Sequence, residues 1–487
     1  MKKGKSALAL IATAAILATV LPGCQNKTSV TSSAAAPSEA SSAEASSAAP
    51  ASSQAAPEGK VLNIWCWNDE FQGRFNNYYP QVKSVAKDKS TTDLKDGTQV
   101  KWTINPNQGN NYQNKLDAAL KTQDTADADS KIDIFLFEAD YALKYVNSDY
   151  TLDVKKDIGL TDDDLSQMYK YTKDIATSKD GALKGVSWQA TPGLYAYRRS
   201  IAKSVFGTDD PDKVQDQLST WDKFNSVAAQ MKAKGYRMLS GYDDSYRVFS
   251  NNVAAGWVNG TSVVVDPNLM NWVTQTKTFT EKGYNNKSIL WDTTWAKDQG
   301  PGSKVFGFFY STWGINFTLM GNSLKTPESN GGKEEVGNGI FGDWAVCKGP
   351  QSWYWGGTWI SGCKGSDNIG TIKDVMKSLT CNKDIAEKIT KVTQDYTNNK
   401  AGMDEIANSD FKSKFLGGQN HIKLFAEVAP TIDMSKAGPY DQGCNEKFQA
   451  AFHDYFNGNV TIDKAKTNFE TAIKTTYPEL TDVKWPS

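Results

Sequence analysis

Residues 353–359, with the sequence Trp-Tyr-Trp-Gly-Gly-Thr-Trp, bring four aromatic side chains and two glycines together. Four large rings in a row do not all fit into one core, and a buried Trp needs a partner for its indole N–H. Some of these rings therefore line a cleft or an interface, with Trp355 and Trp359 as candidates. The glycines allow close approach of the backbone. Rings in a groove offer flat apolar platforms that match the C–H faces of pyranose sugars. The alternative is a structural cluster between two lobes.

The same mixture of rings and polar side chains recurs in three other stretches. These stretches add six candidate ligand contacts: Trp188, Tyr195, Tyr197, Arg198, Trp257 and Trp313. Within a strand, Tyr195 and Tyr197 would point to one face. Trp313 directly follows an apolar run that is typical of a strand. For each of these residues the alternative is packing in the core.

Polar side chains also follow the predicted strands at their ends. Trp67 and Asp69 come directly after the first strand, and Glu138 and Asp140 come after the third. In open parallel sheets the ligand lies beyond the carboxyl ends of the strands. We therefore expect these four residues to contact a ligand. The alternative is that the acids are solvated charges at strand ends.

Strands and helices alternate in the first third of the folded region. The pattern predicts strands at 61–66, 100–104 and 132–137, and helices at 71–85 and 110–120. The run at 132–137 is almost continuously apolar, as in buried parallel strands. This β-α-β-α-β order indicates an α/β fold with a parallel sheet.

A second unit begins near Gly193, where helix boundaries are well marked. Thr220 is a candidate N-cap for a helix at 221–234, and Gly283 stops a helix at 268–282. The chain beyond residue 372 is mainly helical, with helices predicted at 385–396, 446–456 and 465–475. We expect two α/β lobes with a ligand cleft between them.

The N-terminus has the pattern of an export signal. Three lysines within residues 2–5 precede an apolar run of 15 residues and then Leu-Pro-Gly-Cys at 21–24. The run is shorter than the roughly 20 residues of a membrane span and fits a signal peptide. The ending resembles the lipobox of bacterial lipoproteins, which implies a signal peptide over 1–24 and lipidation of Cys24. An ordinary secretory signal with a stray cysteine is the alternative. Residues 25–59, rich in Ser, Ala and Pro, predict a disordered tether.

Composition excludes several classes of function. The 54 basic and 55 acidic side chains give a net charge of −1, which argues against a nucleic-acid-binding protein. Only His421 and His453 are available for a zinc site or a His-based triad. The sequence has no G-x-x-x-x-G-K-[ST] motif, the pattern of a phosphate-binding loop. We therefore expect no metal, no cofactor and no nucleic-acid partner.

Five cysteines follow Cys24 in the sequence. We expect them to be buried and to pack as small hydrophobic residues, although a disulfide between Cys363 and Cys381 is also possible.

Taken in order, these motifs resemble an extracellular carbohydrate-binding protein of an ABC importer, in the broad class of the maltodextrin-binding protein. The resemblance rests on the lipobox, Leu62–Trp67, Ile132–Phe137, Gly185–Trp188, Tyr195–Arg198, Thr220–Asp222, Phe308–Trp313 and Gly356–Trp359. It implies a two-lobe periplasmic-binding-protein-like fold. Lobe one would comprise 60–190 and 353–425, and lobe two 191–352 and 426–487.

The resemblance also implies a function without chemistry. A monomeric, lipid-anchored protein on the outer face of the bacterial cytoplasmic membrane would capture an oligosaccharide and deliver it to ABC permease subunits. Asp69, Glu138, Asp140, Tyr195 and Trp313 would face the cleft, together with Trp355. The alternatives are a receptor for a peptide, polyamine or other small solute on the same scaffold, a cell-surface glycoside hydrolase, and an adhesin without a transporter.

Overall fold

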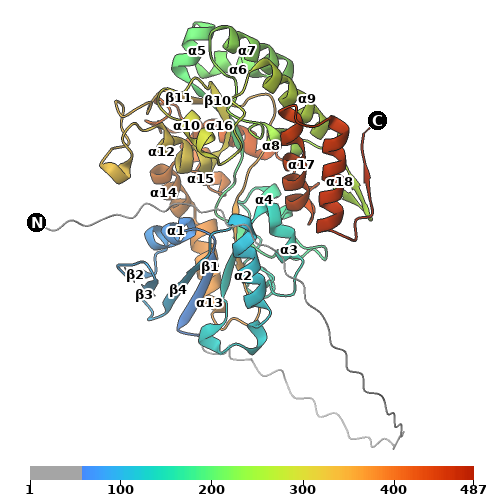
Figure 1. Cartoon of the computed structure of the whole chain (residues 1–487). Helices are drawn as coiled ribbons and strands as arrows, with labels where there is room; N and C mark the ends of the chain where they lie inside the picture. The colour runs from blue at the N-terminus through green and yellow to red at the C-terminus, as the bar shows by residue number, and fades with distance from the viewer. Residues whose placement is uncertain (1–57, 487) are drawn as a thin grey trace, which may run out of the picture. The chain divides into compact units, whose positions relative to one another are not determined.

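The computed structural model describes residues 58–486, which belong to one compact α/β unit (Figure 1). The predicted signal peptide 1–24, the lipidation site Cys24 and tether residues 25–57 lie outside the described residues. Within 58–486, no helix has both the length and the apolar character needed to cross a membrane. The five cysteines of this part are all free, so the Cys363–Cys381 bridge is not formed.

A seven-stranded sheet forms the first lobe. In spatial order its strands are β2 (Val82–Val85), β3 (Thr91–Leu94), β4 (Gln99–Ile104), β1 (Val61–Cys66), β5 (Ile134–Glu138), β12 (Thr358–Gly362) and β6 (Val186–Ser187). β1 pairs in parallel with β4 and β5, as the alternating pattern predicts. β12 returns from far along the chain and pairs antiparallel with β5 and β6. The carboxyl ends of β1, β4 and β5 therefore lie at one edge of the sheet.

Helices pack around this sheet. They are α1 (Glu70–Tyr78), α2 (Asn111–Leu120), α3 (Ala142–Val146), α4 (Lys170–Asp174), α13 (Ile369–Met376) and α14 (Lys383–Thr393). The predicted helix at 71–85 is wrong in its second half. Tyr79 is extended, with φ −72° and ψ 119°, because it precedes Pro80, and a residue before proline avoids the helical region. The chain then enters the edge strand β2.

The second lobe is built on an antiparallel sheet of β10 (Gly307–Ser311), β7 (Gly193–Arg198) and β11 (Trp344–Cys347). Its helices are α5 (Arg199–Phe206), α6 (Pro211–Leu218), α7 (Trp221–Ala233), α8 (Tyr246–Ser250), α9 (Pro267–Lys282), α10 (Thr293–Asp298), α11 (Thr312–Gly314) and α12 (Gly321–Ser323). The Thr220 hydroxyl accepts a hydrogen bond from the Lys223 amide, which confirms the predicted N-cap. Gly283 ends α9 with φ +65°, also as predicted.

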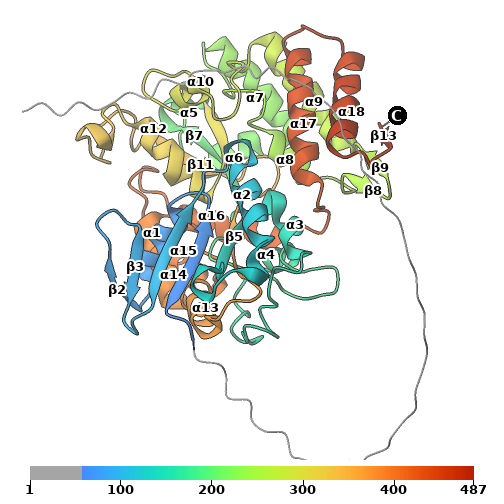
Figure 2. The same cartoon turned by 60° about the horizontal axis from the view of Figure 1, so that its bottom comes forward.

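A separate hydrophobic cluster supports the C-terminal part of this lobe. It joins α17 (Asp441–Phe456) and α18 (Ile462–Thr476) to α9 and to a small sheet of β13 (Asp482–Lys484), β9 (Ser262–Val264) and β8 (Val258–Asn259). Figure 2 shows α17 and α18 beside α9, away from the strands β2 and β3 of the first lobe. The cluster fixes α17, whose N-terminal half reaches back toward the first lobe.

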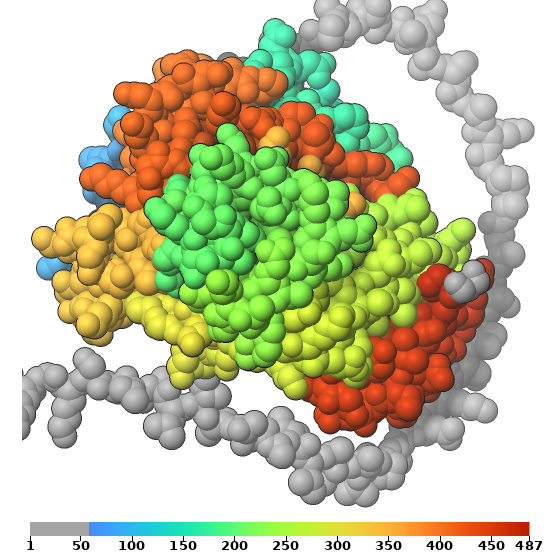
Figure 3. Space-filling view, turned by 90° about the horizontal axis from the view of Figure 1, so that it is seen from above, coloured from blue at the N-terminus to red at the C-terminus, as the bar shows by residue number. Residues whose placement is uncertain are grey.

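The chain passes between the two large sheets more than once. It leaves β6 for β7 through residues 188–192 and returns from β11 to β12 through 348–357, and Pro192 forms a β-bridge with Tyr354. Two further helices, α15 (Lys400–Ala407) and α16 (His421–Val428), follow. The segment between them touches the second lobe, where Arg199 of α5 donates to the Leu416 carbonyl at 3.0 Å. In the space-filling view, the orange surface of the helical region after β12 lies against the green surface of the second lobe (Figure 3). The residue boundaries of the two lobes stay a prediction.

Candidate functional site

A cavity of about 960 Å³ lies between elements of the two lobes. The first lobe contributes the segments that follow β1, β4 and β5 and the segment that leads into β12, and the second contributes α8, residues 290–291, α11 and α17. The volume falls at the upper end of the range for ligand sites, roughly 300–1,000 Å³. The cavity therefore occupies the position at which the strand ends of an α/β sheet bind ligands.

Three tryptophans form the apolar wall of this cavity. Trp291 stacks on Trp313 with 6.2 Å between ring centroids and 16° between ring planes. Trp313 meets Trp355 edge to face at 5.0 Å, and its indole N–H donates to the Trp355 carbonyl at 2.9 Å. Trp291 and Trp313 belong to the second lobe, whereas Trp67 of the first lobe packs against Tyr141 at 6.2 Å. Both lobes thus present ring faces or edges to the same space.

Gly356 makes the close contact between the lobes possible. Its φ is +75°, and a Cβ there would lie 2.9 Å from the indole nitrogen of Trp313. A side chain at this position would push the tryptophan away and adopt a strained backbone. This is the close backbone approach that the glycines next to the aromatic run predict.

A bidentate ion pair links the lobes at the polar end of the cavity. Arg247 of α8 donates to both carboxylate oxygens of Asp140, at 2.8 and 2.5 Å. The same guanidinium lies over the ring of Trp355, 5.4 Å from its centroid. Such a fork fixes geometry as well as charge. Asp140 is therefore neutralised by Arg247.

Glu138 lies two residues before this pair and has an unusual acidity. Its carboxylate accepts a hydrogen bond from the Asp140 amide at 2.9 Å. Its pKa is raised from the ordinary 4.5 to about 8, chiefly because burial disfavours the charged form, while Asp140 adds to the rise and Arg247 opposes it. Near neutral pH a large share of Glu138 is protonated, so the carboxyl group can donate a hydrogen bond as well as accept one.

This shift predicts a pH dependence of stability. A carboxyl group with a raised pKa binds its proton more tightly in the folded chain, so its contribution to stability falls as pH rises from 4.5 through about 8. We expect Glu138→Gln to lose less stability than the unmodified protein between about pH 5 and pH 8. Urea unfolding at both pH values measures this difference. Equal losses in the two proteins would contradict the assignment.

Two polar atoms on the first-lobe wall have no hydrogen-bond partner among residues 58–486. They are the hydroxyl of Tyr141 and the side-chain carbonyl of Asn107, and both residues line the cavity. Buried polar groups are normally paired, and each exception needs an explanation. A ligand carrying hydroxyl groups would pair with both atoms.

Five of the residues singled out from the sequence lie on the cavity wall: Trp67, Glu138, Asp140, Trp313 and Trp355. Asp69 is exposed and lines a neighbouring hollow instead. Trp257 lines a separate hollow of about 40 Å³, donates its N–H to Asn445 at 2.9 Å and packs against Phe448. Trp257 thus has a structural role in the second core.

The other five lie in the interior and require a correction. Tyr195 and Tyr197 do point to one face of β7, but their hydroxyls donate to the carbonyls of Met238 and Asp209 inside the second lobe. Arg198 pairs with Asp343 at 2.8 Å. The remaining two belong to the first-lobe core: Trp188 stacks on Phe71, and Trp359 stacks on Phe137 and donates to the Thr172 carbonyl. Among the described residues, the cavity wall includes none of these five side chains, and the proposed site omits them.

The sequence pattern does not indicate several other residues of the cavity wall. Trp291, Arg247 and Phe317 stand alone in segments without a periodic pattern, and Gln442, Asn445 and Glu446 look like ordinary polar positions of a helix. In the structure, the backbone of Trp291 is in the left-handed region, with φ +72°, and 53% of the residue's surface is exposed. A large residue in the left-handed region is uncommon and deserves a functional explanation.

Trp291 allows a prediction that separates strain from function. Glycine adopts positive φ freely, so Trp291→Gly should be more stable than Trp291→Ala by about 1 kcal/mol. Both variants remove the ring, so both should bind a ligand that stacks on this wall about three- to tenfold more weakly. Thermal unfolding and calorimetric titration of the two variants measure these effects. Unchanged affinity in both variants would remove Trp291 from the site.

Solved structures share this fold. They include the ABC transporter associated binding protein from B. animalis subsp. lactis Bl-04 in complex with β-1,6-galactobiose, at 15% identity and TM-score 0.62, covering 87% of this chain and 100% of that one. The galacto-N-biose-/lacto-N-biose I-binding protein from Bifidobacterium longum has 14% identity and TM-score 0.60, covering 88% and 100%. The GacH receptor of Streptomyces glaucescens GLA.O has 12% identity and TM-score 0.61, covering 86% and 99%. These likenesses confirm the two-lobe α/β fold.

No curated protein sequence matches the chain. The family model of the bacterial extracellular solute-binding proteins matches residues 89–408, which include β4, β5, the whole sheet of the second lobe and β12. The match covers well over half of the chain, and it includes most of the segments that line the cavity. The protein therefore belongs to the family of bacterial extracellular solute-binding proteins.

Proposed function

We propose that the protein is a lipid-anchored binding protein that captures an oligosaccharide in this cavity and delivers it to an ABC import permease. The ligand contacts would come from Trp67, Trp291, Trp313 and Trp355, with hydrogen bonds from Glu138 and its neighbours. Sugar binding would favour a closed arrangement of the lobes that the permease recognises.

One observation carries the proposal: tryptophan rings and hydrogen-bonding side chains from both lobes meet in a single cavity of about 960 Å³. Ring faces suit the apolar faces of sugars, and Glu138, Asn107 and Tyr141 offer groups for hydroxyls. The structures with the same fold support a sugar ligand, because they hold β-1,6-galactobiose, lacto-N-biose and acarbose.

The geometry is also consistent with binding rather than hydrolysis. A glycosidase needs two carboxyl groups that act as acid and as nucleophile or base. Here the Asp140 carboxylate is held by both arms of the Arg247 guanidinium, which leaves Glu138 without a free acidic partner on its own segment. We therefore propose that the sugar is bound and released unchanged.

A sugar panel tests the proposed function. The panel comprises glucose, galactose, β-1,6-galactobiose, lacto-N-biose, acarbose and malto-oligosaccharides, screened by thermal shift and then by calorimetry. A ligand that binds only the folded state raises the melting temperature. At least one di- or oligosaccharide should raise it, with no release of reducing ends. Spermidine and a mixed peptide pool serve as competing ligands, and stabilisation by these alone would overturn the sugar assignment.

A cationic solute is the second candidate, because acids outnumber bases on the cavity wall. The wall carries four acidic residues, Glu70, Glu138, Asp140 and Glu446, and two basic residues, Arg247 and Lys447. Carboxylates with aromatic rings form a site for amines as well as for sugars. The raised pKa of Glu138 favours a neutral ligand, however, since a neutral carboxyl group attracts a cation less strongly.

Anchoring through Cys24 and a monomeric state complete the proposal. The described chain begins at Glu58, whose carboxylate accepts hydrogen bonds from the amides of Gly370 and Thr371 at the start of α13. The segment that leads to Cys24 therefore joins the folded unit at the first lobe. Incorporation of labelled palmitate into the full-length protein, but not into Cys24→Ala, would support the lipid anchor.

A further inference from the structure

A second hollow of about 530 Å³, lined in large part by α1, adjoins the cavity. This outer groove is lined by Gln72, Arg74, Asn76 and Asn77 of α1 and by Asn316 of the second lobe, among others. It shares Glu70, Trp313 and Phe317 with the cavity. The two hollows together exceed the roughly 300–1,000 Å³ of a typical small-molecule site. The combined space suits a chain-like ligand.

A row of rings leads from the cavity to the outer groove. Trp291 is followed by Trp313 at 6.2 Å and then by Phe317 at 6.3 Å, measured between ring centroids. Phe317 is 61% exposed and Trp291 is 53% exposed, so two large apolar rings of this row face solvent. Asn316 and Phe317 both belong to a π-helical segment, Ile315–Met320, and π-helical turns occur frequently at functional sites.

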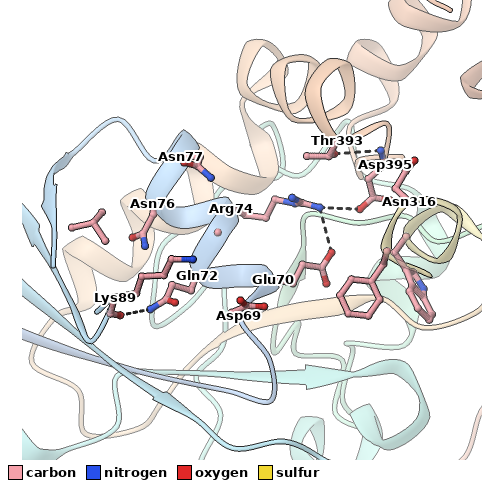
Figure 4. Close-up of a pocket in the computed structure, with 14 residues that line it drawn as sticks. Asp69, Glu70, Gln72, Arg74, Asn76, Asn77, Lys89, Asn316, Thr393 and Asp395 are labelled. Carbon is pink, nitrogen blue, oxygen red and sulfur yellow. Dashed lines mark hydrogen bonds and ion pairs between the residues drawn. The ribbon is translucent and has the colours of Figure 1, made fainter. Parts of the chain in front are cut away.

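Polar atoms without partners gather in the same groove. Within the described part of the chain, the Nε of Arg74 and both amide atoms of Asn316 have no hydrogen-bond partner. Figure 4 shows Arg74 extending from α1 toward Glu70 and Asp395, with Asn316 close to them. These atoms come from both lobes and include donors and an acceptor, which is the combination that sugar hydroxyls satisfy.

Charge at the groove argues against an anionic occupant. The Arg74 guanidinium lies 3.4 Å from a carboxylate oxygen of Glu70 and 3.9 Å from one of Asp395. Gln189 donates to both carboxylates, at 2.8 and 3.0 Å. The positive charge of Arg74 is therefore already balanced, and Asp69 offsets Lys89 at the rim. A neutral, hydroxyl-rich segment fits this environment.

We infer that the ligand is a neutral oligosaccharide longer than a disaccharide, whose distal units enter the outer groove between Arg74 and Asn316. This inference rests on the proposed function and extends it to the length of the ligand. The units in the cavity contact the three tryptophans, and the distal units pass Phe317 and satisfy the unpaired atoms of Asn316.

The test uses size ladders from di- to hexasaccharide of malto-oligosaccharides and β-1,6-galacto-oligosaccharides, titrated by calorimetry. Two variants change the groove alone: Asn316→Ala removes the amide, and Asn77→Trp fills the groove from the exposed face of α1. The matched controls are Asn330→Ala and Asn330→Trp at an exposed site that lines neither hollow.

In the unmodified protein, affinity should rise by about tenfold from the disaccharide to the tetrasaccharide, the equivalent of one or two further contacts. Asn316→Ala and Asn77→Trp should remove most of this gain and leave disaccharide affinity unchanged, whereas the controls should keep the gain. Two results would overturn the inference while the proposed function stands. One is disaccharide binding with no increase in affinity for longer sugars, and the other is an increase that both variants retain. Failure of every sugar in both ladders to bind would overturn both.

Discussion

Replacing Trp313 by alanine is expected to lower oligosaccharide affinity by about 10- to 100-fold, because at least two ring contacts are lost and each contributes roughly 0.5–1.5 kcal/mol. Trp313 lines both the cavity and the outer groove. It also holds Trp291 by stacking and Trp355 by its N–H bond to the Trp355 carbonyl. Its removal therefore disturbs the whole ring wall.

Calorimetric titration with the best sugar from the panel measures this loss. Trp313→Phe is the matched variant, because it keeps a ring but removes the hydrogen bond to Trp355. It should retain most of the affinity if ring stacking dominates. Affinity of Trp313→Ala equal to that of the unmodified protein, with an unchanged melting temperature, would show that the ligand lies elsewhere.

Arg247→Ala should destabilise the folded protein by about 3 kcal/mol, near the lower end of the cost of removing one partner from a buried ion pair. The side chains of Arg247 and Asp140 are 24% and 25% exposed, so solvent screens the pair in part. The substitution leaves Asp140 next to Glu138 without a positive partner, and it also removes the contact of the guanidinium with Trp355. The two lobes lose the link between α8 and the end of β5.

Urea unfolding at neutral pH measures this change. Arg247→Lys keeps a positive charge but loses the bidentate hydrogen bonds of the guanidinium. Its stability should lie between those of the unmodified protein and Arg247→Ala. Adding Asp140→Asn to Arg247→Ala should restore part of the stability, because the unpaired carboxylate is then gone. A loss below about 0.5 kcal/mol would place the pair with ordinary surface ion pairs and contradict its role in joining the lobes.

The parts of the fold that depend on local pattern could be predicted from the sequence. β1 has the predicted bounds, and the apolar run at 132–137 contains most of β5, because strand patterning is visible in single segments. Trp67, Glu138 and Asp140, chosen because they lie at the carboxyl ends of these strands, do line the cavity, and their contact with a ligand stays a prediction. The N-cap Thr220 and the stop Gly283 likewise follow from short-range chemistry.

The rest depends on contacts between distant segments. β12 begins inside the aromatic run at 353–359, and nothing local indicates that it pairs with β5. β7 is buried along its whole length, so alternation could not tell whether Tyr195 faced the cleft or the core. Arg247 reaches the cavity on α8, and Trp291 reaches it next to α10, where its ring packs on Trp295 at 5.1 Å between centroids. Single residues in such segments carry no periodic signal.

A crystal structure of the protein with a bound oligosaccharide from the panel tests most directly whether the sugar lies in this cavity. We expect sugar rings against Trp291, Trp313 and Trp355, with hydroxyls bonded to Glu138. A sugar bound elsewhere, or lobes that close on a different ligand and exclude sugars from this cavity, would contradict this expectation.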